Sequence, residues 1–114
     1  MPEESPGPLE PLVEIRTTFP DRVTATACAE RLVRERMAAC AQVDGPVAST
    51  YSWRGVVERA EEWRCTCKTT PERAAACRAA IAAAHPYEIP ELVELRVTAS
   101  AAYAAWVRES IGVM

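Results

Sequence analysis

The order in which two kinds of hydrophobic repeat follow one another limits the fold of this chain more than any other feature. Period-two alternation or extended character, typical of β-strands, occurs in four segments: residues 12–18, 40–53, 56–69 and 91–98. Apolar residues at three- and four-residue steps, typical of amphipathic helices, occupy the segments between them: residues 21–37, 71–84 and 101–111. The sequence therefore predicts the order strand, helix, strand, strand, helix, strand, helix.

Capping and turn residues stand at the ends of these segments. Asp21, Thr70 and Ser100 are good N-cap residues, each placed directly before a helical repeat. Arg54-Gly55 lies between two extended segments and predicts a hairpin turn. Asp44-Gly45-Pro46 interrupts the preceding strand and predicts a bulge or kink there. The local signals therefore agree with the periodic ones.

This order of elements is typical of an α+β fold, the ferredoxin-like βαββαβ split sandwich, here with an extra C-terminal helix. We expect residues 1–11, rich in proline and glutamate, to form a disordered tail and residues 12–112 to form a single domain. Two helices cover only one face of the sheet. The uncovered face and the last helix need a partner, so we expect a homo-oligomer.

Composition excludes several classes of protein. The formal net charge of -3 and the pI near 5.2 give no general attraction to nucleic acid or anionic lipid. No stretch approaches the roughly 20 apolar residues of a membrane helix, and the N-terminus does not resemble a signal peptide. The five cysteines are odd in number and lie within periodic segments, which favours reduced thiols. We therefore expect a cytoplasmic protein with no nucleic-acid or membrane partner.

The only histidine of the chain, His85, stands in an unusually stiff segment. Pro86 and Pro90 restrict the backbone on either side of Tyr87 and Glu88. An imidazole, a phenol and a carboxylate on such a loop can form a ligand-binding corner. They can equally form a helix-to-strand turn with a half-buried tyrosine. The local chemistry leaves both interpretations open.

Six ordered motifs resemble the CutA divalent-cation tolerance family over about residues 13–110. They are Thr18-Phe19-Pro20-Asp21, Arg36-Met37-Ala38-Ala39-Cys40, Tyr51-Ser52-Trp53-Arg54-Gly55, Lys68-Thr69-Thr70, His85-Pro86-Tyr87-Glu88-Ile89-Pro90-Glu91 and Ala102-Tyr103-Ala104-Ala105-Trp106. The resemblance implies a homotrimer of ferredoxin-like subunits, a link to tolerance of copper and other divalent metals, and an architecture similar to PII-type signalling proteins. It implies no known reaction.

A metal site is one expectation from these residues. In the family, copper is associated with the histidine of His-Pro-Tyr, here His85, and in one bacterial member with a cysteine at the position of Thr17. Thiolate and imidazole ligands suit Cu(I) or Zn(II), and the predicted hairpin folds Cys40 back toward Cys67. Cys40, Cys67 and His85 are therefore the candidate metal ligands. The alternative is that the thiols fill the core, as buried free cysteines usually do.

A second candidate site is a cleft between subunits. Its candidate residues are Tyr51, Trp53, Lys68, Tyr87 and Glu88, which together suit a small anion or a metal chelate. The alternative is packing at a subunit interface, with Lys68 and Glu88 as an ion pair.

These observations favour a protein that contributes to divalent metal (copper) ion tolerance through direct but modest metal binding. The alternative is a PII-like signalling or scaffold trimer that binds an organic ligand or a protein partner at the cleft. We expect no enzyme, because Cys40 and His85 have no third orienting group and no oxyanion loop in the sequence. We expect no organic cofactor, since the four glycines form no phosphate-binding loop.

Overall fold

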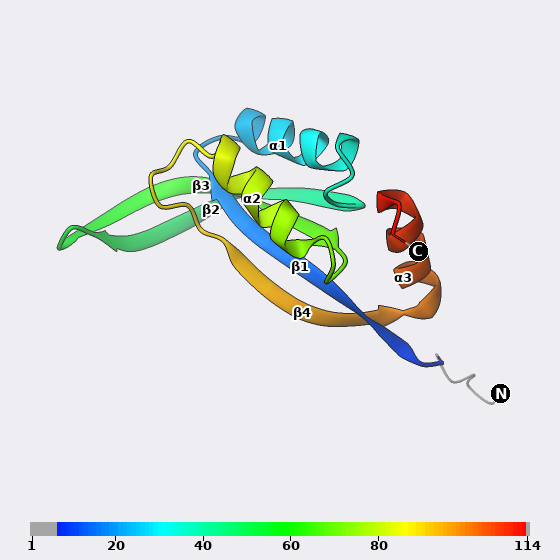
Figure 1. The fold of residues 1–114 in the computed structure, drawn as a ribbon. Coiled ribbons are helices and arrows are strands. Elements are labelled where there is room, and N and C mark those ends of the chain that lie inside the picture. The colour runs from blue at the N-terminus through cyan, green and yellow to red at the C-terminus, as the bar shows by residue number, and fades with distance from the viewer. Residues whose placement is uncertain (1–6, 114) are drawn as a thin grey trace.

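The seven expected elements are present in the expected order. A computed structural model describes residues 7–113 of the chain (Figure 1). Its elements are β1 (Leu9–Phe19), α1 (Arg22–Arg34), β2 (Cys40–Trp53), β3 (Val56–Thr69), α2 (Ala74–Ala84), β4 (Val93–Ser100) and α3 (Ala101–Ile111). Within residues 7–113, no helix is long and apolar enough to cross a membrane.

The four strands form one antiparallel sheet in the order β2-β3-β1-β4, which confirms the α+β ferredoxin-like arrangement. Arg54 and Gly55 join β2 to β3 with φ angles of 51° and 81°, the left-handed conformations of a tight hairpin turn. The predicted bulge lies in β2, where the pairing with β3 shifts between Asp44 and Val47. Figure 1 shows the hairpin projecting beyond the rest of the sheet.

The sheet carries a separate apolar cluster on each face. Val13 and Ile15 belong to the larger cluster, which also includes side chains of α1 and α2. Leu12 points to the opposite face and packs with Val107 and Ile111 of α3. Because successive strand residues alternate between faces, β1 supplies both clusters. Figure 1 shows α1 and α2 together on one face, and α3 at the end of the sheet near the C-terminus.

Helix α1 begins as expected and ends earlier than expected. The Asp21 side chain accepts a hydrogen bond of 2.7 Å from the Thr24 N–H, and this bond lowers the pKa of Asp21. The predicted end at residue 37 is wrong, because the last helical residue is Arg34. Arg36 has a left-handed φ of 60°, and the Met37 N–H donates to the Leu32 carbonyl. This closure is of the Schellman type and turns the chain toward β2.

Three other boundaries differ from the sequence expectation. Strand β1 begins at Leu9, so residues 9–11 are not part of a disordered tail but pair with residues 98–100 of β4; residues 1–6 of that tail lie outside the described residues. Residues 71–73 form a turn, closed by the Arg73 N–H on Thr70, and α2 begins only at Ala74. Strand β4 covers Val93–Ser100 rather than residues 91–98.

Helix α3 is capped by Ser100, as predicted, and buries one stripe of side chains against the sheet. The Ser100 hydroxyl accepts a hydrogen bond from the Tyr103 N–H. Ala104, Val107 and Ile111 are buried, whereas Trp106 remains 47% exposed. Residues 104, 107 and 111 follow the spacing of one helical stripe, and position 106 lies to its side. Hydrophobicity alone did not identify which of these side chains the sheet covers.

A candidate site between the hairpin and the loop after helix α2

His85 ends α2, and both of its ring nitrogens are occupied. Its ring stacks on Phe19, with centroids 4.5 Å apart and planes 15° from parallel. The Tyr87 backbone N–H donates to Nδ1 at 3.1 Å, so Nδ1 is the acceptor and Nε2 carries the proton. Nε2 then donates to the Thr18 carbonyl at 2.8 Å. The imidazole is thereby held neutral and ties the loop after α2 to the end of β1.

This arrangement makes stability depend on pH. Burial lowers the pKa of His85, and the Thr18 carbonyl and the nearby Glu62 carboxylate oppose that shift only partly. The other ionisable group against the ring is Tyr87, which stays neutral at these pH values. The unfolded chain binds a proton near the ordinary pKa of about 6.5, whereas the folded chain binds it only at lower pH. We therefore expect the melting temperature to fall as the pH is lowered from 7.5 to 5.5.

A His85→Gln variant separates this effect from other titrating groups. Glutamine does not titrate, so the decrease in melting temperature between pH 7.5 and 5.5 is expected to be smaller in the variant than in the wild type. Melting curves followed by circular dichroism at both pH values measure the difference. Equal decreases in the two proteins would assign the pH dependence to groups other than His85.

Tyr87 and Glu62 form a buried polar contact beside the histidine. The Tyr87 hydroxyl donates to a Glu62 carboxylate oxygen at 2.9 Å, and Glu62 is only 8% exposed. Burial, together with this hydrogen bond, raises the pKa of Tyr87 to about 12. The phenol therefore remains a hydrogen-bond donor over the physiological pH range. A buried carboxylate needs such a donor, because desolvation without a partner is unfavourable.

The proline after the histidine is expected to stabilise this loop through the unfolded state. Pro86 has no N–H to lose, and its ring limits the conformations of the unfolded chain. Pro86→Ala is expected to lower the free energy of unfolding by about 1 kcal/mol. Urea unfolding at constant protein concentration measures the change. An unchanged transition midpoint would show that the proline does not restrict the unfolded ensemble in this way.

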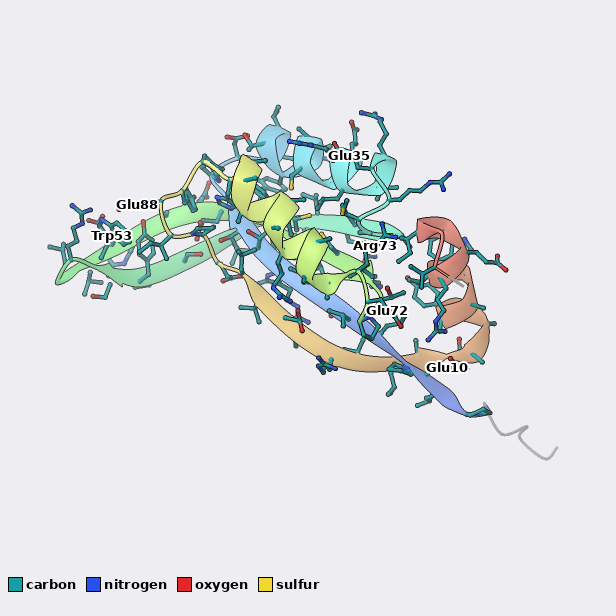
Figure 2. The ribbon with its side chains drawn as sticks, viewed as in Figure 1. Glu10, Glu35, Trp53, Glu72, Arg73 and Glu88 are labelled. Atoms are coloured by element: carbon teal, nitrogen blue, oxygen red, sulfur yellow. The ribbon has the colours of Figure 1, made fainter. Side chains whose placement is uncertain are left out.

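The loop and the hairpin enclose a pocket of about 740 Å³. Its lining residues are Thr18, Ser49, Thr50, Tyr51, Trp53, Glu62, Pro86, Tyr87, Glu88, Ile89, Pro90 and Glu91. The polar part of this lining includes carboxylates and hydroxyl groups, and the apolar part includes aromatic rings, two prolines and Ile89. Four of the five residues expected in the cleft line this pocket: Tyr51, Trp53, Tyr87 and Glu88. Figure 2 shows Trp53 and Glu88 at the hairpin end, away from Glu10 and Glu72.

Within one chain, Lys68 does not line this pocket and does not pair with Glu88, and the ion pair across a subunit interface stays a prediction. The Lys68 ammonium lies 5.7 Å from the centre of the Tyr103 ring, near α3. Glu88 instead lies 3.5 Å from the guanidinium of Arg54, which also stands 5.3 Å from the centre of the Trp53 ring. The physical reason is the length of the hairpin, because Arg54 is at its turn and Lys68 is near the far end of β3.

The expected metal ligands Cys40, Cys67 and His85 do not meet within one chain. In the β2–β3 register, Cys40 lies opposite Lys68 while Cys67 lies opposite Ala41, so the two thiols point to opposite faces. Cys67 pairs with Ile15, whereas His85 contacts Thr18, roughly 10 Å further along β1 at the usual rise of a strand. Among residues 7–113, no group of three or more His, Cys, Asp or Glu side chains is placed to hold a metal ion.

Glu62 and Glu91 are the functional-site candidates that sequence reasoning missed. Glu62 belongs to a run of charged residues that includes Glu61, which is exposed. Nothing local distinguishes the two glutamates. Their difference follows from the bulge in β2, which brings Val47 opposite Glu62 and allows the loop after α2 to cover it. Glu91 directly follows Pro90, so the proline-restricted loop was a sequence feature that indicated a candidate site close to this residue.

Comparison with known proteins agrees with this architecture. The family model of the CutA1 divalent ion tolerance protein matches residues 13–110. A curated CutA protein from Thermus thermophilus is 34% identical over 96 residues, which cover 83% of this chain and 93% of the relative.

Two solved structures extend the likeness to the fold. CutA from Synechococcus elongatus has a TM-score of 0.85 at 32% identity, covering 92% of this chain and 96% of that one. A CutA from Archaeoglobus fulgidus, described as periplasmic, has a TM-score of 0.84 at 28% identity, covering 88% and 98%. With its order of elements, its sheet and nearly its whole length matched, this chain belongs to the CutA1 divalent ion tolerance protein family, which is defined by tolerance of metal ions rather than by a reaction.

Proposed function

We propose that this protein contributes to tolerance of divalent metal ions, copper among them, by direct but modest binding at the pocket beside the hairpin. The observation that supports this most is the presence of carboxylates in its lining, of which Glu88 and Glu91 are exposed, although within residues 7–113 no three of them are placed to hold one ion together. Carboxylate oxygens are ligands for many divalent cations. Glu62 is already bonded to Tyr87 and Glu88 to Arg54, so a cation competes with these contacts and binds weakly.

We further propose that the functional form is a homotrimer in the cytoplasm. Exposed apolar side chains on the hairpin, β1, β4 and α3 support self-association: Val56, Val57, Leu9, Val93 and Trp106. Strands β2 and β4 also lie at the two edges of the sheet, where backbone groups are free to pair with another chain. Light scattering at micromolar concentration is expected to give three times the chain mass. Cell fractionation tests the location.

A second candidate function is favoured by the shape of the same pocket. Its volume of about 740 Å³ lies within the usual range for small-molecule sites, roughly 300–1,000 Å³. Tyr51 and Trp53 supply flat apolar surfaces beside the carboxylates. An organic ligand that carries a positive charge suits this combination better than a bare ion does. In that case the protein is a PII-like signalling or scaffold trimer.

Calorimetric titration with Cu(II) and Zn(II) distinguishes the two functions. Metal binding at the pocket predicts weaker binding in a Glu88→Gln, Glu91→Gln double variant. Glu72→Gln serves as the control, because Glu72 is exposed and lies at the other end of the molecule (Figure 2). Equal heats in the wild type and the double variant would exclude the pocket as the metal site. An organic molecule retained through purification and lost in a Trp53→Ala variant would support the second function.

The tolerance itself is tested in cells. A strain without the gene is expected to grow more poorly than its parent at elevated copper, and the wild-type gene is expected to restore growth. The Glu88→Gln, Glu91→Gln variant is expected to restore it less well than the Glu72→Gln control. Equal copper sensitivity of the strain and its parent would contradict the proposed tolerance function.

A further inference from the structure

Three thiols that the site does not use gather in the core beneath α1 and α2. Cys65 and Cys67 come from β3, Cys77 comes from α2, and all three are 0% exposed. The sulfurs of Cys65 and Cys67 are 3.9 Å apart. Cys28 of α1 packs against the same cluster and is half-buried, so it is the member of the group nearest to solvent. All five cysteines of the chain are free thiols, as expected from the sequence.

A buried hydroxyl without a partner lies beside this thiol cluster. Thr17 is 0% exposed and stands directly opposite Cys65 in the β1–β3 register, on the same face of the sheet. Among the described residues its Oγ1 has no hydrogen-bond partner. Buried polar atoms are nearly always hydrogen-bonded, and an exception calls for an explanation such as an ion or a water. The thiol cluster therefore adjoins a hydroxyl group that forms no hydrogen bond with the described residues of the protein.

We propose that Cys65 and Cys67 bind one soft monovalent metal ion, Cu(I) or its analogue Ag(I), inside the core, with Cys77 beside them. Sulfur ligands select soft ions. Metal–thiolate bonds are about 2.3 Å long in zinc sites, so two sulfurs on one ion lie at most roughly 4.6 Å apart. The observed 3.9 Å, the distance of a hydrogen bond between the two thiols, lies within that limit. Two sulfurs from one strand supply the ligands of a low-coordinate site.

Charge favours a monovalent ion at this position. Binding replaces one thiol proton by one M⁺, giving RSH + R′SH + M⁺ → RS–M–S(H)R′ + H⁺, so the net charge of the core does not change. A divalent ion that displaces one thiol proton adds a positive charge in a low-dielectric interior, which is unfavourable, and it leaves the charge unchanged only by displacing both thiol protons.

The thiol cluster and the carboxylate pocket are separate sites with opposite ligand preferences. Cys67 pairs with Ile15, in the middle of β1, whereas the pocket contacts the end of β1 at Thr18. The soft-ion site therefore stands whether or not the pocket binds divalent ions. If one site does not bind its ion, the proposal for the other site is unaffected. The variants that test the two sites change different residues.

Competition with a chromophoric Cu(I) chelator, on reduced protein under argon, tests the soft-ion site. We expect one Cu(I) retained per chain, with release of one proton, and the same stoichiometry for Ag(I). Loss of a ligand in Cys67→Ala is expected to weaken Cu(I) binding by more than about 100-fold, beyond the usual effect of losing only an outer-shell contact. Cys40→Ser is the matched control, because Cys40 points to the other face of the sheet. It is expected to retain wild-type affinity.

X-ray absorption at the copper edge of the wild-type complex keeps the test independent of whether Cys67→Ala folds. The proposal expects sulfur scatterers alone in the first shell. Nitrogen or oxygen ligands, or unchanged affinity in Cys67→Ala, or Cu(I) lost from Cys40→Ser, would each overturn it. Zn(II) retained as tightly as Cu(I) would overturn the assignment of a soft monovalent ion to this site.

Discussion

Replacement of Phe19 by alanine is expected to lower the free energy of unfolding by about 3–5 kcal/mol. Phe19 is buried in the larger apolar cluster, so truncation leaves a cavity under α1 and α2. It also removes the ring on which His85 stacks at 4.5 Å. The histidine then keeps its two hydrogen bonds and its contact with the Tyr87 ring. We therefore expect faster hydrogen exchange at the Tyr87 N–H as well as lower stability.

Phe19→Leu separates the two contributions, because leucine refills most of the cavity but cannot stack. A volume-preserving apolar substitution usually costs less than about 1.5 kcal/mol. Denaturant unfolding gives the free energies, and exchange monitored by NMR reports on the loop. If Phe19→Leu protects the Tyr87 N–H as well as the wild type does, ring stacking does not hold the loop in place.

Gly45→Ala is expected to destabilise the protein by about 1–3 kcal/mol through overpacking. A Cβ at this position would lie 2.8 Å from Cε3 of Trp63 and 3.1 Å from the Glu62 carbonyl oxygen. The Trp63 ring is partly buried and packs against the larger apolar cluster, which restricts its movement. Relief of the clash therefore shifts either the bulge in β2 or the strand that carries Glu62. Thermal unfolding measures the loss of stability.

Gly55→Ala is the matched control for the bulge glycine. Both glycines have positive φ angles, 157° and 81°, but a Cβ at Gly55 meets no atom within 4 Å. The control therefore reports the effect of backbone conformation alone, about 1 kcal/mol for a left-handed residue. If the two variants melt at the same temperature, the contact with Trp63 has no energetic consequence.

Much of the fold followed from local physics. Alternation around Cys65 and Cys67 identified a strand with one buried face, and Arg54-Gly55 identified the hairpin turn. Asp21 and Ser100 marked helix starts that the structure confirms. These features depend on neighbours within a few residues, so they can be predicted from a single sequence. The end of α1 was harder to predict, because it depends on the left-handed backbone conformation of Arg36, and arginine is not a residue type that usually indicates this conformation.

The candidate site was likewise predicted better in its local features than in its long-range contacts. The stiff segment around Pro86 and Pro90 lines the same pocket as Tyr51 and Trp53, which were grouped with it, and ligand binding there stays a prediction. Within one chain, Lys68 does not line the pocket, and the Cys40 and Cys67 thiols point to opposite faces of the sheet although the hairpin brings the two residues to the same end. Both differences concern register and direction. A one-residue difference in pairing exchanges the two faces of a strand, and alternation alone does not fix which residues stand opposite one another.

The sequence by itself determined the order of elements, the turn chemistry and the family, because each of these depends on patterns of residues that are close together in the sequence. Only the tertiary structure decided which polar groups meet. It placed Glu62 under the Tyr87 hydroxyl, occupied both nitrogens of His85, and gathered Cys65, Cys67 and Cys77 away from the pocket. Such contacts join residues far apart in the chain, and the bulge at Gly45 and the packing of helices on one face set their geometry.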